Sequence, residues 1–261
     1  MALVCLRKWY LDVVTPEGTA AIVYAARLGV AGFTTGYQSV LFSQEGLAPA
    51  TTTSFRAPAQ PRVDGNVLSW DSAALKVEGV WEGLAPGLER TVLQRPAGAV
   101  VWQCLQPASR VQFNLGTTTL AGLGYAEVLD VTLAPWDLPI HTLRWGRFVA
   151  NDAAVVWIDW QGPHTFACVV LDGAEVKAAQ VADTALVLGD ATLALDRGRV
   201  LRDGTLGSTA LARLPPRLAR TLPGRALSLR ETKWLSRGVL SRRGRPDALG
   251  WAIHEVVQWP G

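Results

Sequence analysis

The chain has 261 residues, of which 49% are hydrophobic and 18% are charged, and its formal net charge is +3. This length allows one large domain or two small ones, and the composition excludes a disordered chain. Three cysteines without motif spacing exclude a disulfide framework, and the sequence shows neither the features of a signal peptide nor an apolar run of membrane-spanning length. We therefore expect a reduced, cytoplasmic protein.

Apolar residues recur with a period of two along most of the chain, which is typical of β-strands. The first predicted hairpin joins strands at residues 8–14 and 19–28 around the turn TPEG. A polar, proline-rich stretch at residues 48–64 predicts a long connection or an irregular sheet edge. Further strands are predicted at residues 74–83, 91–96, 99–107, 110–116, 117–133, 153–162, 165–173, 175–181, 184–190, 191–198 and 199–207.

Turn signals separate these strands at intervals of roughly ten residues, which predicts an all-β sandwich or barrel. Asp172-Gly173 and Asp203-Gly204 predict hairpin turns. Residues 211–221 could form a short helix, which the two central prolines would break. The segment APWDLP at residues 134–139 interrupts the strand pattern. It predicts two domains, residues 1–134 and 135–261, each with enough strands for a barrel, and we see no residue-level repeat between them.

The sequence lacks the motifs of several common classes of enzyme and binding site. The sequence contains no GxxxxGK[ST] phosphate loop, no GxSxG nucleophile elbow and no CxxC, and its three histidines are isolated from one another. Gly122 and Gly124 begin a GxGxxG, but Glu127 stands at its third glycine position. We therefore expect no metal and no cofactor.

The C-terminal third is strongly basic. Residues 213–245 carry ten Lys or Arg and one acid, Glu231, but no nucleic-acid motif. The region could be a solvated face of β-hairpins, which we favour, or it could contact an anionic membrane surface. We expect no nucleic-acid partner.

Eleven tryptophans are spread along the whole chain. They could fill the cores of large β-structures, or they could line a pocket for a lipophilic ligand. The sequence leaves both interpretations open.

Three short motifs carry a family resemblance. Trp102 is followed by Pro107, the pair Gly124-Tyr125 precedes an acid at Glu127, and residues 145–147 read WGR. This arrangement resembles the carotenoid 1,2-hydratase (hydroxyneurosporene synthase) and AttH-like superfamily of lipocalin-like proteins. The resemblance implies two lipocalin-like (calycin) antiparallel β-barrels packed together, and a lipophilic small molecule as the ligand.

The chain also departs from the family's motifs. Ala126 replaces the first histidine of the acidic box, Val100 replaces a histidine before the tryptophan, and the acid is Glu rather than Asp. Residues 128–131 replace the HNWG that should follow. The missing histidines favour a non-catalytic carrier for a hydrophobic molecule, whereas the retained tyrosine–acid pair favours an enzyme.

Tyr125 and Glu127 are the predicted catalytic residues. They share one face of a strand because side chains alternate, with Ala126 and Val128 on the other face. If their face is buried, desolvation would raise the pKa of Glu127 and make it a proton donor to an alkene. Alternatively, Arg144 or Arg147 could pair with Glu127 across neighbouring strands and remove this function.

The predicted enzyme hydrates or cyclises a carbon–carbon double bond of an isoprenoid or polyene. Protonation of the alkene creates a carbocation, which aromatic faces stabilise through cation–π attraction. Trp102 and Trp145 are the predicted substrate-binding aromatics, together with Arg144 and Arg147. Attack by water would make the enzyme a hydratase (lyase), and attack by a group of the substrate itself would make it a cyclase.

Overall fold

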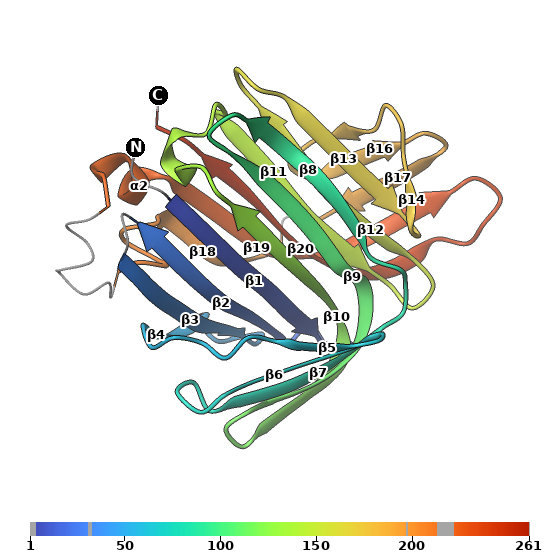
Figure 1. Cartoon of the computed structure of the whole chain (residues 1–261). Helices are drawn as coiled ribbons and strands as arrows, with labels where there is room; N and C mark the ends of the chain where they lie inside the picture. The colour runs from blue at the N-terminus through green and yellow to red at the C-terminus, as the bar shows by residue number, and fades with distance from the viewer. Residues whose placement is uncertain (1–3, 31–32, 197, 213–221, 261) are drawn as a thin grey trace. The chain divides into compact units, whose positions relative to one another are not determined.

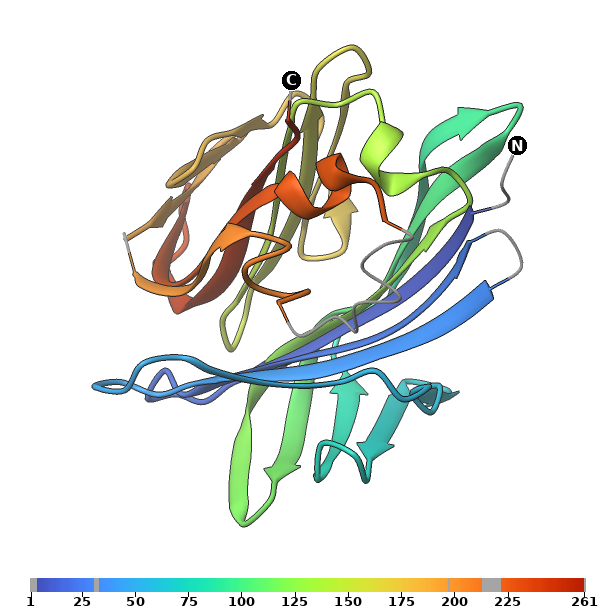
Figure 2. The same cartoon turned by 90° about the vertical axis from the view of Figure 1, so that its left-hand side faces the viewer.

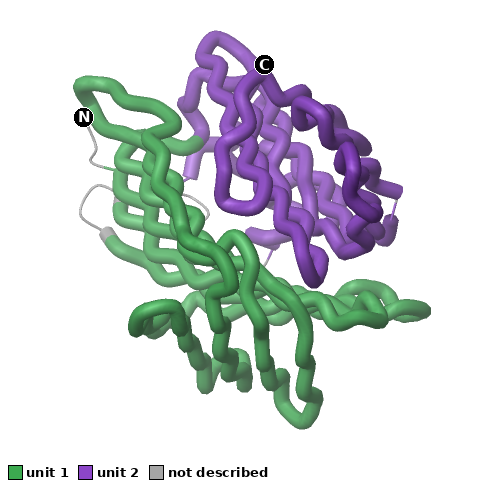
Figure 3. The backbone as a smooth tube through the Cα atoms, turned by 90° about the vertical axis from the view of Figure 1, so that its right-hand side faces the viewer, with its two compact units in different colours: residues 1–135 green, residues 136–261 purple. Residues whose placement is uncertain are grey.

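The computed structural model describes residues 4–30, 33–196, 198–212 and 222–260 of the chain. In it, segments of alternating apolar and polar residues form long antiparallel strands. The chain divides into two units, residues 1–135 and 136–261 (Figure 3). The predicted boundary between residues 134 and 135 lies one residue before this division. The described part contains no helix with the length and hydropathy of a membrane span.

Unit 1 is one antiparallel sheet, in which ten strands are described (Figure 1). Its hydrogen-bonded order is β4-β3-β2-β1-β10-β9-β7-β6-β5, and β8 also pairs with β9. The strands are β1 (Val4–Val14), β2 (Ala20–Val30), β3 (Phe33–Ser43), β4 (Ala50–Ser54), β5 (Arg62–Asp64), β6 (Val67–Ser72), β7 (Val77–Gly83), β8 (Leu88–Arg95), β9 (Gly98–Leu115) and β10 (Thr118–Val131).

The sheet of unit 1 curls into a half-barrel. Figure 2 shows β6, β7 and the tip of the β9–β10 hairpin turned away from the plane of β1–β3. One face of the sheet packs into a hydrophobic cluster in which Trp9, Leu11 and Val13 of β1 meet Trp81 of β7 and Phe113 of β9. Ala126 and Val128 of β10 belong to this cluster as well. Tryptophans therefore fill the core of unit 1.

Unit 2 repeats this architecture in ten described strands. Its order is β14-β13-β12-β11-β20-β19-β17-β16-β15, with β18 pairing β19. The strands are β11 (Thr142–Val149), β12 (Ala154–Gln161), β13 (Phe166–Leu171), β14 (Ala174–Glu175), β15 (Gln180–Val181), β16 (Ala185–Leu188), β17 (Ala191–Leu195), β18 (Arg199–Thr205), β19 (Arg230–Arg242) and β20 (Ala248–Gln258). A 3₁₀ helix, η1 (Pro135–Asp137), precedes β11, and a one-turn helix, α2 (Gly224–Ser228), precedes β19. The core of unit 2 gathers around Phe148, Trp157 and leucines of β16 and β17.

The predicted all-β fold is confirmed, and so is the first hairpin, formed by β1 and β2. The stretch 48–64 contains β4 and β5, the two end strands of the sheet order, so it is an irregular edge. Asp172-Gly173 is a turn between β13 and β14. The turn predicted at Asp203-Gly204 is wrong, because both residues lie within β18 and pair with Thr232 and Glu231 of β19. Most of the helix predicted at residues 211–221 lies outside the described residues.

Candidate functional site

Glu127 lies near the middle of β10, between β1 and β9 in the sheet of unit 1. Its partners in register are Tyr10 of β1 and Cys104 of β9. Glu127 is only 5% exposed, and Tyr10, Cys104 and Tyr125 are buried with it. The hydrophobic cluster of unit 1 contains Ala126 and Val128, so Glu127 faces away from that cluster. The predicted alternation is therefore correct, but the acid does not point into the half-barrel's core.

Two donors meet one carboxylate oxygen of Glu127. The indole Nε1–H of Trp102 donates to Oε2 at 2.6 Å, and the hydroxyl of Tyr125 donates to the same oxygen at 2.8 Å. Trp102 comes from β9 and Tyr125 from Glu127's own strand, so the sheet register positions both. Burial, helped by the neighbouring Cys104 and Glu127, raises the pKa of Tyr125 well above its ordinary value. Its hydroxyl therefore stays protonated near neutral pH and remains a donor.

This geometry restricts where Glu127 can carry a proton. An indole N–H can only donate, so Oε2 acts as an acceptor toward Trp102. A neutral Glu127 would therefore hold its proton on Oε1. Aromatic rings surround the acid: Tyr10 meets Tyr125 edge-on at 6.0 Å and Tyr24 at 5.4 Å between ring centroids.

Glycines of β10 allow the strand to approach β1 closely beside this site. A Cβ on Gly122 would lie 2.1 Å from the carbonyl oxygen of Val14, and one on Gly124 would lie 2.1 Å from that of Asp12. No real Cβ tolerates such distances, so any other residue would force the strands apart. The glycines noted in the sequence thus serve strand packing, and their place inside a strand gives no support to dinucleotide binding.

The predicted residues of the WGR segment belong to unit 2. Trp145, Arg144 and Arg147 lie on β11, which pairs with β12 and β20. The expectation that an arginine reaches Glu127 from a neighbouring strand is therefore wrong about the strand, because β11 is not in the sheet of β10.

The contacts of these three side chains within unit 2 are specific. Arg144 forms ion pairs with Asp159 at 3.7 Å and Asp183 at 2.8 Å. Nη1 of the buried Arg147 donates to the carbonyl of Trp251 at 2.9 Å. The ring of Trp145 lies 5.4 Å from Nζ of Lys233. Substrate binding by these three residues stays a prediction.

A half-buried glutamate of unit 2, at a position equivalent to Glu127, was not identified from the sequence. Glu255 occupies β20, whose place in the sheet order matches that of β10, and its partners in register are Trp145 and Lys233. Lys233, itself buried, forms an ion pair with Glu255 and a second one with Glu231 at 3.6 Å. The spacing Gly-x-x-x-x-Glu occurs at residues 122–127 and again at 250–255, and it could have revealed this equivalence.

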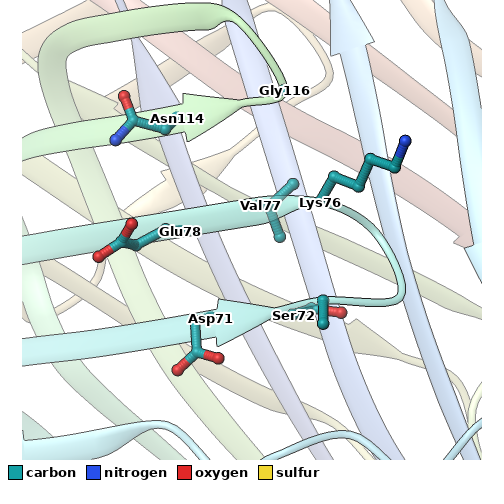
Figure 4. A pocket seen from close by; sticks show the side chains of 8 residues that line it. Asp71, Ser72, Lys76, Val77, Glu78, Asn114 and Gly116 are labelled. Carbon is teal, nitrogen blue, oxygen red and sulfur yellow. The ribbon is translucent and has the colours of Figure 1, made fainter.

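Other described parts of the chain are weaker candidates for a functional site. A hollow of about 310 Å³ lies between the β6–β7 and β9–β10 turns (Figure 4). It is lined largely by polar residues, including Asp71, Lys76 and Glu78, and it lies at the opposite end of β9 from Trp102. Such a hollow does not suit a lipophilic ligand. Among the described residues, no three histidine, cysteine, aspartate or glutamate side chains form a group that could hold a metal ion.

The chain is similar in structure to several solved proteins, including the following three. A putative AttH from Nitrosomonas europaea has a TM-score of 0.55 at 10% identity, over 95% of this chain and 92% of that one. The fold is that of the AttH-like proteins. CghA with Sch210972 has a TM-score of 0.55 at 10% identity, over 98% and 89% of the two chains.

Kievitone hydratase from Nectria haematococca has a TM-score of 0.53 at 10% identity, over 97% of this chain and 88% of that one. No protein-family model and no curated protein sequence matches the chain. The resemblance predicted from the sequence is thus confirmed at the level of the fold.

Proposed function

We propose that this protein is an enzyme that adds water to a carbon–carbon double bond of a lipophilic isoprenoid or polyene, or cyclises it. The observation that carries the proposal is the buried carboxyl group of Glu127, held at Oε2 by Trp102 and Tyr125. The fold adds support, because one structural neighbour is named a hydratase.

The proposed reaction begins with Glu127 in its neutral form. The proton on Oε1 passes to one alkene carbon, whose π electrons form the new C–H bond and leave a cation on the other carbon. The rings of Tyr10, Tyr125 and Trp102 stabilise this cation. Water adds to it through oxygen and returns one proton to the carboxylate, so the net change is the addition of one water molecule.

Cyclisation shares the first of these steps. A nucleophilic group of the substrate attacks the cation in place of water and releases its proton to Glu127. The product then has the mass of the substrate. Water access to the cation thus decides between the two outcomes.

Product masses test the proposal. The purified protein is incubated with micellar neurosporene, lycopene, squalene or kievitone in water enriched in heavy oxygen, and the products are separated by liquid chromatography with mass spectrometry. We expect a product that carries one labelled hydroxyl group, or an isomer of unchanged mass and altered retention. Tryptophan quenching by a substrate that is recovered unchanged would contradict the proposal and indicate a carrier.

A further inference from the structure

The outer face of unit 2 carries an apolar strip that its core does not use. Ala185 of β16, Ala194 of β17, Val239 of β19 and Leu249 of β20 are partners in register across four neighbouring strands, and Val187 lies two residues along β16 on the same face. Val187 is 42%, Val239 36% and Leu249 72% exposed, and Ala194 is exposed too. We call these five residues the apolar strip.

The strip belongs to strands whose other face forms the core of unit 2. Leu186, Leu193, Leu240 and Ala248 alternate with the strip residues, and all four lie in the hydrophobic cluster. Leucine and valine gain nothing for folding on the solvent side of a sheet, where polar side chains normally stand. A row of apolar side chains here therefore indicates a surface that something else covers.

Arginines flank the strip. Arg237 shares its face, and its guanidinium lies 5.2 Å above the ring of Trp251. The turn that joins β19 to β20, drawn in orange-red in Figure 1, presents Arg243 and Arg245 to solvent. Arg242, the last residue of β19, forms ion pairs with Asp152 and Asp172.

We infer that the apolar strip and its arginines dock on an anionic lipid bilayer. Apolar side chains enter the boundary between headgroups and acyl chains, while guanidinium groups contact lipid phosphates and carboxylates. Each basic residue near such a surface adds binding free energy that salt screens. This inference rests on the surface of unit 2 and holds whether or not Glu127 is catalytic.

A second copy of the chain fits this face less well. A two-fold interface brings the same patch of both copies together. Arg237, Arg243 and Arg245 of both copies would then be gathered in one interface, and like charges across an interface oppose association. An anionic bilayer complements the same charges.

Vesicle flotation tests the inference. The full-length protein is mixed at low salt with vesicles of phosphatidylcholine alone, or of phosphatidylcholine with about a third phosphatidylserine. We expect flotation with the anionic vesicles, little with the neutral ones, and release at high salt. Failure to float with the anionic vesicles, or equal flotation with both, would overturn the inference.

Paired variants locate the surface. We expect Arg243→Gln/Arg245→Gln and Val239→Ser/Leu249→Ser each to lower the vesicle partition coefficient about tenfold or more. The matched controls are Arg56→Gln/Arg95→Gln and Leu47→Ser/Leu84→Ser, which change exposed residues of unit 1.

All four variants change surface side chains, so their unfolding temperatures should stay close to that of the wild type. The inference is overturned if the control variants lose as much binding as the strip variants. It is also overturned if the strip variants abolish a concentration-dependent dimer seen by light scattering, because a second copy would then cover the face.

Discussion

Glu127 shows at the scale of single residues how a short sequence spacing can position a functional group. Tyr125 is two residues away on the same strand, so the pleat places both side chains on one face and the hydroxyl reaches Oε2. Trp102 reaches the same oxygen from β9 because the sheet register brings that strand alongside. The fold thus orients the carboxyl group from two directions.

His254 makes the stability of unit 2 depend on pH. Its ring stacks on Trp234 at 5.2 Å, and its Nε2 lies 2.9 Å from Oγ of Ser236. Burial, followed by the charge of Lys233, lowers the pKa of His254 to about 4. The unfolded chain binds a proton near the ordinary histidine pKa, at about 6.5, so between these two values it holds a proton that the folded chain lacks.

We therefore expect the free energy of unfolding to fall by roughly 2–3 kcal/mol from His254 alone as the pH drops from about 7 to about 4.5. Urea unfolding at the two pH values measures this loss. In the His254→Gln variant the difference between the two pH values should shrink by a similar amount. An equal pH dependence in variant and wild type would show that His254 does not protonate on unfolding.

Gly124 is one of the two glycines on which the close approach of β10 to β1 depends. We expect Gly124→Ala to lower the free energy of unfolding by about 1–3 kcal/mol, because its Cβ would meet backbone and the strands must move apart. The matched control is Gly224→Ala in α2, where the added Cβ meets nothing within 4 Å. Denaturant unfolding should show the control unchanged or slightly more stable, and an equal effect of both substitutions would contradict this account.

At the scale of elements, the three central strands of unit 1 and the three central strands of unit 2 carry different side chains at equivalent positions. The row across β1, β10 and β9 reads Tyr10, Glu127 and Cys104, whereas the row across β11, β20 and β19 reads Trp145, Glu255 and Lys233. Lys233 forms an ion pair with Glu255 in unit 2. The row in unit 2 therefore has a structural role, whereas the proposed acid chemistry concerns the row in unit 1.

The structural role of Lys233 can be measured. We expect Lys233→Met to lower the free energy of unfolding by roughly 3–5 kcal/mol, because Glu231 and Glu255 would lose a buried cation that compensates both. Adding Glu255→Gln to that variant should restore part of the loss, since one of the two carboxylates that lost Lys233 is then made neutral. Guanidinium unfolding of the wild type and the two variants tests this, and no recovery in the double variant would contradict it.

Elements that pair with segments close to them in the sequence were predictable from the sequence alone. The β1–β2 hairpin and the face shared by Tyr125 and Glu127 follow from alternation and turn chemistry alone. Asp203-Gly204 misled because its turn signal is overridden by pairing of β18 with β19, a strand distant in the chain. The strand that carries Arg144 and Arg147 was not predictable for a similar reason, because β11 follows β10 in the sequence but belongs to the other sheet.

At the scale of the whole molecule, strand number and turn spacing were enough to predict an all-β chain. They could not show which face of β10 meets the hydrophobic core, because both faces of the strand carry apolar residues and only the curl of the sheet selects one. The row of Trp145, Glu255 and Lys233 in unit 2 could not be predicted, because Lys233 looks like a surface residue until β19 is placed beside β20.

The central claim is that Glu127 protonates the substrate, and single-turnover kinetics of Glu127→Gln tests it most directly. The amide oxygen of glutamine can still accept from Trp102 and Tyr125, so the fold should persist and substrate should still quench tryptophan fluorescence. We predict a rate of product formation about 100-fold to 10,000-fold below that of the wild type and of the exposed control Glu45→Gln. A Glu127→Gln protein that turns over its substrate at the wild-type rate would contradict the account.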